Sequence, residues 1–253
     1  MPSTTEPKVP AAFQPRPEDY RYDLDRALMS VVGLHSIIPP DAFSAETLGT
    51  ERTGNGVLID NGLVLTIGYL ITEAATVWLH LGDGRAVEGH ALGFDFESGF
   101  GLVQALGRLD IDPLPIGSSA ATQVGDNVVL GGAGGRTRSV ASQIAAKQEF
   151  AGYWEYLLDE AIFTYPAHPN WGGTGLINNA GELIGIGSLQ LERERSGRAE
   201  HVNMIVPIAI WPIAGLASTK RGSLVSSVAP PSTITSPRLA QVMVPSACPL
   251  TRA

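Results

Sequence analysis

The sequence predicts an all-β protein with a short N-terminal helix and flexible termini. Short runs of β-branched and aliphatic residues recur up to about residue 217, separated by glycine, proline, asparagine and aspartate. Many short strands at close spacing are typical of a β-sandwich or a β-barrel. The two ends of the chain lack this pattern: residues 1–19 hold five prolines, and the end of the chain is rich in serine, threonine and proline. We therefore expect a disordered leader over 1–19 and a tail without a core pattern over 218–253.

Composition limits the classes of function that the chain can have. Its 253 residues are 44% hydrophobic, which is enough to bury one large core or two small ones side by side. A formal charge of -8 gives no basic stripe to neutralise phosphates, so we expect no nucleic-acid partner. The opening residues do not resemble a secretory signal, and no stretch is apolar for long enough to span a bilayer. With a single cysteine, Cys248, the chain forms no internal disulfide, and we expect a cytoplasmic protein without membrane contact.

Local sequence patterns predict the first helix, strands and hairpins. Between Tyr20 and Leu34 apolar residues recur at a helical period and then become β-branched, which predicts a short helix running into a first strand. Next, Asp60-Asn61-Gly62 predicts a tight hairpin, because asparagine and glycine both tolerate positive φ. The glycine-rich turn 82–85 predicts a second hairpin. Further strands are expected at 102–105, 128–130, 143–146, 161–164, 176–177, 183–186 and 204–206.

Several blocks occur in an order that points to a known family. Residues 54–60 look like the block GSGVIID, 65–71 stand where LTNNHVV is expected, 82–85 are similar to ADGR, 114–129 to LP..LG...VGD.V, 139–144 to TVTSGI, 170–178 to a nucleophile loop, and 203–208 to IGFAIPI. Together they resemble the protease domain of the HtrA/Deg branch of trypsin-like serine proteases, over about residues 28–217. The resemblance implies a two-barrel trypsin/chymotrypsin-like fold with the active site in the cleft between the barrels. Residues 20–118 would form the N-terminal helix and first barrel, and 119–217 the second barrel. No PDZ-like Gly-Leu-Gly-Phe pattern follows residue 217, so we expect no such module.

The resemblance also locates the catalytic positions, and all three are substituted. The histidine position is Tyr69, the aspartate position is Gly99 and the serine position is Gly172. That chemistry needs a hydroxyl nucleophile, a base and an orienting carboxylate. Tyrosine ordinarily titrates near pH ~10 and is a poor base at neutral pH. No histidine lies between His35 and His80, so local realignment does not restore the base. We therefore expect a catalytically inactive homologue, a pseudoprotease without proteolytic activity.

The loop around the lost nucleophile is expected to keep an anion-binding backbone. Asn170, Trp171, Gly172 and Gly173 form the oxyanion-type loop of the resemblance, where glycine permits a tight turn that aims successive N–H groups at a carbonyl oxygen. This predicts a peptide or a small carbonyl or carboxylate ligand in the residual cleft. The alternative is that the glycines serve only a turn.

The strand after this loop offers an edge to a partner. Ser188, Leu189 and Gln190 extend it at the place where the resemblance implies backbone pairing with an extended peptide. An ordinary edge strand is the alternative. We thus expect a peptide or protein ligand and no cofactor, and the oligomeric state is left open.

An enzymatic alternative remains. A hydrolase or another enzyme would reuse the cleft with Tyr69, His168 or Thr174. Thr174 has the simpler role of packing or capping its loop, and His168 is a loop residue fixed between two prolines. Whether Tyr69 or Trp171 fills the space vacated by the triad is also open.

The remaining polar residues have ordinary explanations. Ser98 lies beside the Gly99 position but lacks a base, and Asp95 and Glu97, which would share one face of a strand, are expected to be solvated carboxylates. The glycine-rich segment 131–136 lacks the Gly-Lys-Ser/Thr ending of a phosphate loop and is expected to be a loop of the second barrel.

The histidines do not suggest a metal site. None of the five, His35, His80, His90, His168 and His201, shows a metal-ligand spacing. His80 and His90 lie on either side of one hairpin, where a two-histidine metal site is the alternative. Ordinary strand histidines explain them, and we expect no metal.

Overall fold

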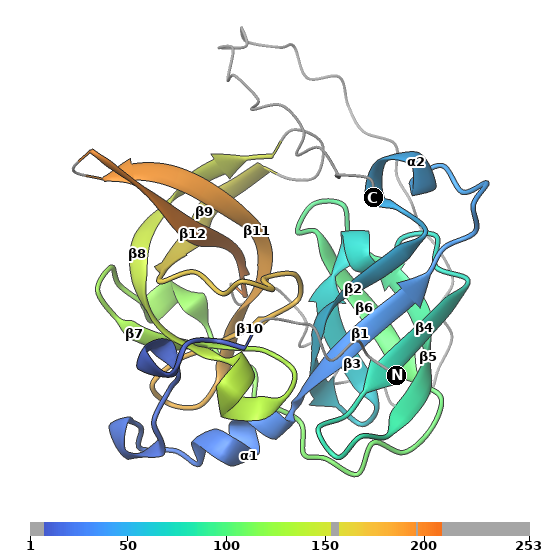
Figure 1. Ribbon diagram of the computed structural model, residues 1–253, viewed down its shortest axis with the longest axis horizontal. Helices are drawn as coiled ribbons and strands as arrows, with labels where there is room; N and C mark the ends of the chain where they lie inside the picture. The colour runs from blue at the N-terminus through green and yellow to red at the C-terminus, as the bar shows by residue number, and fades with distance from the viewer. Residues whose placement is uncertain (1–7, 153–156, 196, 209–253) are drawn as a thin grey trace, which may run out of the picture. The chain divides into compact units, whose positions relative to one another are not determined.

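Two closed barrels make up the part of the chain that the structure describes, residues 8–152, 157–195 and 197–208 of a computed structural model (Figure 1). The first barrel consists of β1 (Val31–Ile37), β2 (Glu51–Asp60), β3 (Leu63–Ile67), β4 (Thr76–His80), β5 (Ala86–Phe94) and β6 (Phe100–Ala105). The second consists of β7 (Asn127–Gly131), β8 (Val140–Ala151), β9 (Leu157–Tyr165), β10 (Gly175–Ile177), β11 (Leu183–Arg195) and β12 (Arg198–Pro207). Their strand orders are β1-β2-β3-β6-β5-β4 and β10-β11-β12-β9-β8-β7. The predicted all-β, two-barrel fold is confirmed.

Helices are few and short. The α-helices are α1 (Leu24–Met29) and α2 (Ala45–Leu48), and the 3-10 helices are η1 (Ala11–Phe13), η2 (Pro17–Asp19), η3 (Gly68–Leu70), η4 (Ser119–Ala121) and η5 (Gly135–Arg138). The side chain of Asp23 accepts a hydrogen bond from the Arg26 N–H and caps the first turn of α1. One face of α1 is buried, and β1 begins two residues after the helix ends. The predicted helix running into a first strand is therefore present.

The turn between β2 and β3 is tight, as the Asn-Gly pair predicts. Asp60 lies opposite Leu63, so two residues close the hairpin. Gly62 has a φ of 70°, whereas Asn61 does not have a positive φ. The Asn61 N–H donates to Asp60 Oδ1 at 2.7 Å instead. Only one of the two turn residues therefore uses the conformation that favours Asn-Gly.

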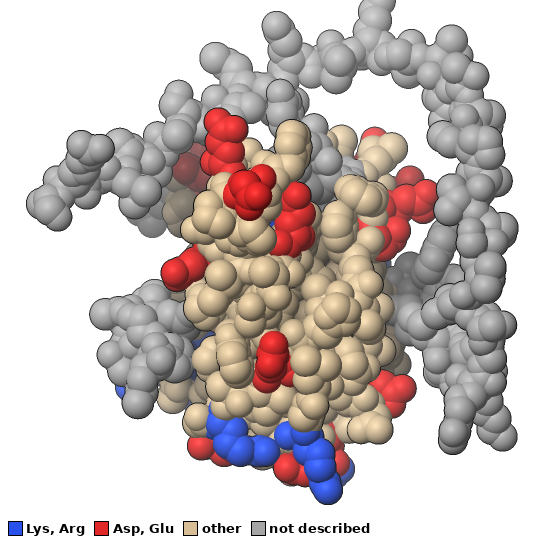
Figure 2. Space-filling view, turned by 90° about the vertical axis from the view of Figure 1, so that its right-hand side faces the viewer, with Lys and Arg blue, Asp and Glu red and all other residues tan. Residues whose placement is uncertain are grey.

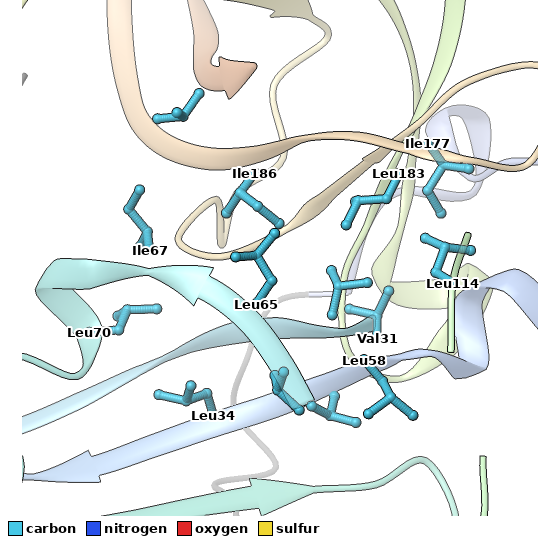
Figure 3. Packing of buried hydrophobic residues seen from close by; sticks show 14 of the residues in the cluster. Val31, Leu34, Leu58, Leu65, Ile67, Leu70, Leu114, Ile177, Leu183 and Ile186 are labelled. Atoms are coloured by element: carbon cyan, nitrogen blue, oxygen red, sulfur yellow. The ribbon is translucent and has the colours of Figure 1, made fainter. Parts of the chain in front are cut away.

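A hydrophobic cluster joins the two barrels (Figure 3). Its labelled members are Val31, Leu34, Leu58, Leu65, Ile67 and Leu70 from the part of the chain that builds the first barrel, with Leu114, Ile177, Leu183 and Ile186. Burying one such side chain contributes about 1.5–3 kcal/mol. This shared core fixes η3 on one barrel next to the β9–β10 loop on the other, and those two segments form the candidate site.

The prediction of a disordered leader over 1–19 is wrong for residues 8–19. Val9 is 3% exposed and packs with Val128 and Leu130 in the interior of the second barrel. Its N–H donates to the carbonyl of Thr137 at 3.1 Å, and its own carbonyl accepts from Gln14 at 2.7 Å. A single valine followed by proline has no periodicity that would reveal its burial. Residues 1–7 and the tail predicted over 218–253, with Cys248, lie outside the described residues.

The strands of the second barrel are longer than predicted. The apolar runs 143–146, 183–186 and 204–206 lie inside β8, β11 and β12, which continue into polar sequence. β11 and β12 pair as far as Arg195 opposite Arg198. The long hairpin satisfies backbone groups whatever the polarity of the side chains, so hydrophobicity alone underestimated its length.

Figure 2 shows one face of the molecule, where acidic side chains are dispersed and lysine and arginine gather at the lower edge. Arg85 pairs with Asp83 at 2.7 Å and with Asp110 at 3.2 Å, and Arg108 pairs with Asp110 at 3.0 Å. Such exposed pairs are screened by water and contribute little to stability. Within the described ranges, no helix has the length and apolar character needed to cross a membrane.

Candidate functional site

The three positions that the resemblance assigns to catalysis meet where the barrels join. Tyr69 lies in η3, Gly99 in the connection from β5 to β6, and Gly172 in the loop from β9 to β10. The N–H of Gly68 donates to the carbonyl of Gly99 at 2.7 Å, so the Gly99 backbone lies beside the residue that precedes Tyr69. An idealised Cβ on Gly172 would lie 2.7 Å from the Tyr69 hydroxyl. Three segments that are distant in the sequence are thus in contact.

The Tyr69 hydroxyl occupies the space into which a side chain at position 172 would extend. Real Cβ atoms essentially never approach a neighbour within 3.0 Å, so any Cβ on Gly172 would have to displace the phenol. The hydroxyl donates to the carbonyl of Ser188 at 2.8 Å. The sequence left open whether Tyr69 or Trp171 fills the vacated space; the atoms nearest to the Cβ position belong to Tyr69 and Leu70. Tyr69 therefore fills it.

Asn55 of β2 holds the Gly172 loop by its carbonyl groups. Its Nδ2 donates to the carbonyls of Asn170 at 3.1 Å and Gly172 at 3.0 Å, and its backbone N–H donates to the Gly172 carbonyl at 2.8 Å. Its Oδ1 accepts from the Ala133 N–H at 2.9 Å. Asn55 is 2% exposed, and away from water such bonds are strong. Asn55 was not predicted as a site residue, and the asparagine in place of the serine of the block GSGVIID was its signal in the sequence.

Two N–H groups of this loop donate hydrogen bonds within the protein. Asn170 donates to His168 Nδ1 at 3.0 Å, and Gly173 donates to the carbonyl of Gly187 at 2.8 Å. The N–H of Gly172 makes no hydrogen bond with the described part of the chain. The predicted oxyanion-type loop therefore does not present all its N–H groups to an external ligand.

Residue 173 has to be a glycine, because its backbone lies very close to the backbone of Asn55. Its φ is 74°, a region that residues with a side chain rarely adopt. An added Cβ would also overlap the carbonyl oxygen of Asn55. The turn that carries the loop against β2 thus depends on glycine at this position.

His168, predicted to line the cleft, is enclosed at 3% exposure. Its Nε2 lies 2.6 Å from the carbonyl of Arg138, and its Nδ1 accepts from the N–H of Asn170. Because a carbonyl only accepts and an N–H only donates, the ring must be the neutral tautomer with its proton on Nε2. Burial lowers the pKa of His168, and the charge of Arg138 lowers it as well, while the hydrogen bond to the carbonyl of Arg138 acts in the opposite direction. Both ring nitrogens are therefore engaged within the protein.

The other candidate hydroxyls serve local structure. Thr174 is buried, and both its hydroxyl and its N–H donate to the carbonyl of Trp171, at 2.8 and 3.1 Å. Ser98 donates to Asp95 Oδ2 at 2.6 Å. Asp95 and Glu97 do not share a strand face, because β5 ends before them, and Asp95 caps a turn by accepting from the N–H groups of both Glu97 and Ser98.

Residues 188–190, predicted as a peptide-binding edge, lie on β11 where its register with β12 shifts. β10 pairs with β11 only as far as Ile186. The Ser188 carbonyl turns toward the first barrel, where it accepts from Tyr69. Beyond the shift β11 pairs with β12, and within the described ranges no strand pairs with the other side of β11 at Gln190.

Arg52 is a buried cation that the sequence analysis missed. The Arg52 Nη1 donates to the carbonyls of Tyr69 at 2.7 Å and Thr72 at 3.0 Å, and its Nη2 donates to Ser44 Oγ at 2.7 Å. Glu73 accepts from the Ser44 N–H at 2.6 Å and anchors the same segment. Arg52 thereby fixes η3 and Tyr69. Its position on β2 between two exposed neighbours, which places it on the buried face, was the signal.

A metal site does not emerge from the described residues, since no group of three histidine, cysteine, aspartate or glutamate side chains there could hold an ion. The ring of His80 stacks on that of His35, with centroids 6.5 Å apart. His90 instead lies opposite Gln104 on β6. Burial lowers the pKa of His80, and His35 lowers it further.

Comparisons with known proteins agree with the fold. The sequence profile described as "Trypsin-like peptidase domain" matches residues 54–186. The chain is 33% identical over 141 residues to "Periplasmic pH-dependent serine endoprotease DegQ" of Escherichia coli (strain K12), a match that covers 54% of this chain and 31% of that one. It is 24% identical over 202 residues to "Serine endoprotease DegS" of Salmonella typhimurium, covering 77% and 55%. The chain thus spans less than two thirds of the length of these relatives.

Solved structures give the same result for the fold. "HtrA-type protease AlgW with tripeptide" aligns with a TM-score of 0.58 at 20% identity, over 73% of this chain and 58% of that one. "HtrA-type protease AlgW with decapeptide" aligns with a TM-score of 0.55 at 20% identity, over 73% and 62%. At this identity the likeness establishes the fold alone.

Proposed function

The chain belongs to the family of trypsin-like peptidase domains, and on this premise we propose that it is a catalytically inactive member that binds an extended peptide. The observation that carries the proposal is the contact between Tyr69 and Gly172. A phenol hydroxyl lies where the side chain of a nucleophile would begin, and it donates to Ser188 in the other barrel. A serine in that position would require the Tyr69 side chain to move.

The chemistry of the site supports the loss of proteolysis. Gly172 offers no nucleophile and Gly99 no carboxylate, while Tyr69 is a neutral hydrogen-bond donor rather than a base. His168 and Thr174, which the enzymatic alternative needs, are buried and bonded within the protein. With every triad member absent, only the modest acceleration from binding would remain.

The side of β11 that pairs with no strand among the described residues beyond Ile186 supports peptide binding. A strand edge whose N–H and C=O groups face outward binds an extended chain through main-chain hydrogen bonds. Tyr69 already takes the Ser188 carbonyl, so the peptide would pair from Gln190 onward. A relative of the same fold has been solved with a tripeptide, which fits this class of ligand.

Inactivity is tested with a fluorophosphonate probe and unfolded casein, with active trypsin as a control for both reagents. We expect neither labelling nor turnover by the purified protein. Labelling at a single residue, or turnover that tracks the protein through successive purification steps and falls in Tyr69→Phe or Thr174→Ala, would overturn the inactive assignment.

Peptide binding is tested separately, by fluorescence anisotropy of labelled unfolded casein. Gln190→Pro removes the backbone N–H of residue 190, whereas the matched control Gln190→Ala keeps it. We expect the proline variant to bind about tenfold more weakly, the effect of roughly one lost hydrogen bond, and the alanine variant to bind as the wild type does. Equal binding by all three proteins, or no binding by the wild type, would remove β11 as the binding edge.

A further inference from the structure

His168 is a buried ionisable group that is hydrogen-bonded to the Gly172 loop through Asn170. The ring accepts the Asn170 N–H at Nδ1 and approaches the Arg138 carbonyl, 2.6 Å away, through Nε2. The backbone N–H of His168 donates to Asn203 Oδ1 at 2.5 Å, so the residue itself cannot move away easily. The imidazole is therefore held in one orientation, and Nδ1 is its remaining acceptor.

We propose that this contact is a pH-sensitive switch. The hydrogen bond holds the Gly172 loop while the His168 imidazole is neutral, and it is lost, releasing Asn170, when the imidazole takes up a proton. The reason is the direction of the hydrogen bond. Protonation turns Nδ1 into a donor, and two N–H groups 3.0 Å apart cannot share a hydrogen bond. The Nε2 bond to Arg138 survives protonation because Nε2 already donates. The ring thus stays in place and the Asn170 peptide has to turn away.

The groups around the ring set the direction of this response. From η5, the carbonyl of Arg138 favours a charged ring and its guanidinium opposes one. β12 presents the neutral Asn203, and the end of β7 presents Gly132, whose absent side chain leaves room for the ring. Burial opposes the charge most strongly, so release needs a pH below the ordinary pKa of histidine.

Protonation of His168 affects only one of the contacts that hold the Gly172 loop. Asn55 holds the carbonyls of Asn170 and Gly172 and contains no ionisable group. Gly173 is tied to Gly187 by a bond that does not involve the ring. Acidification should thus free the Asn170 N–H and leave Gly173 in place. This inference does not depend on the proposed peptide binding.

Hydrogen exchange of single amides, followed by NMR on the full chain between pH 7.5 and 4.5, tests the proposal. The ring proton shifts of His168 report its titration, and exchange is normalised for its intrinsic pH dependence. We expect the protection of the Asn170 amide to fall about tenfold per pH unit below the titration midpoint, because one proton competes with one hydrogen bond. The amide of Gly173 is the internal control and should keep its protection.

Two variants complete the test. His168→Asn keeps an acceptor at the place of Nδ1 but does not titrate, and should hold Asn170 with unchanged protection at all these pH values. His201→Asn, on the exposed side of β12, should behave as the wild type. The proposal is overturned if Asn170 keeps its protection while His168 titrates, if Gly173 loses protection together with it, if the ring does not titrate before the protein unfolds, or if His168→Asn responds to acid as the wild type does.

Discussion

The side chain of Asn55 in one barrel and the carbonyl of Gly172 in the other are joined by a hydrogen bond of 3.0 Å. The backbone N–H of Asn55 donates to the same oxygen at 2.8 Å. Both residues are buried. The first barrel therefore sets the position of the Gly172 loop without any contribution from a ligand.

Removing this link should destabilise the protein. Asn55→Ala deletes three side-chain hydrogen bonds of a buried residue, which predicts a loss of about 2–4 kcal/mol in the free energy of unfolding. Urea titration measures it. The control Asn179→Ala changes an exposed loop asparagine and should stay within about 0.5 kcal/mol of the wild type. Equal effects of the two substitutions would contradict the role assigned to Asn55.

Tyr69 and Gly172 should be energetically coupled. Gly172 does not have a positive φ, so the main cost of Gly172→Ala is the displacement of the Tyr69 hydroxyl. In a Tyr69→Phe background that cost should be smaller by about 1 kcal/mol. A double-mutant cycle by urea unfolding gives the coupling energy. Additivity to within about 0.3 kcal/mol would show that the phenol does not fill the space next to Gly172.

Gly173 and Gly84 offer a matched pair of glycines. Both have a positive φ, 74° and 89°, but an added Cβ meets nothing within 4 Å at Gly84 and overlaps Asn55 at Gly173. Gly84→Ala should cost about 1–2 kcal/mol from backbone strain alone. Gly173→Ala adds a steric clash and should cost about 3–5 kcal/mol, or prevent folding. Thermal or urea unfolding of both variants measures the two losses of stability. Similar losses for Gly84→Ala and Gly173→Ala would refute the close approach of Gly173 to Asn55.

The burial of His168 predicts how stability depends on pH. Burial lowers the pKa of His168 in the folded protein, so on acidification the unfolded chain takes up a proton first. The stability owed to the neutral ring is complete above about pH 6.5 and declines as the pH falls toward the folded pKa, by up to about 1.4 kcal/mol per pH unit. Urea unfolding between pH 7.5 and 5 should show a shallower decline for His168→Asn than for the exposed control His201→Asn. Parallel curves would contradict the prediction.

Much of the fold could be predicted because its signals are local. The Asp60-Asn61-Gly62 turn, the helical spacing before β1 and the ordered blocks each depend on neighbouring residues. Val9 could not be placed, because its burial depends on a contact with residues more than a hundred positions away. The polar ends of β11 and β12 were missed for a related reason, since pairing rather than hydrophobicity sustains them.

The candidate site, like the fold, could be predicted from the sequence only in part. The order of the blocks pointed to Tyr69 and Gly172, but the bond from Tyr69 to Ser188 crosses between the barrels and has no trace in either segment. The link from His168 to Asn170 is local, yet its direction depends on which nitrogen the Arg138 carbonyl engages. The cytoplasmic location, the absence of a cofactor and the peptide partner remain predictions.

The Tyr69 hydroxyl has a consequence for how this sequence can change over evolutionary time. A side chain at position 172 finds room only after residue 69 has become smaller or has turned away, because an added Cβ would lie 2.7 Å from the phenol oxygen. Substitution at position 69 meets no such barrier, since Gly172 has no side chain. Under the proposed loss of activity, a nucleophile side chain could therefore return at position 172 only after Tyr69 had turned away or been replaced.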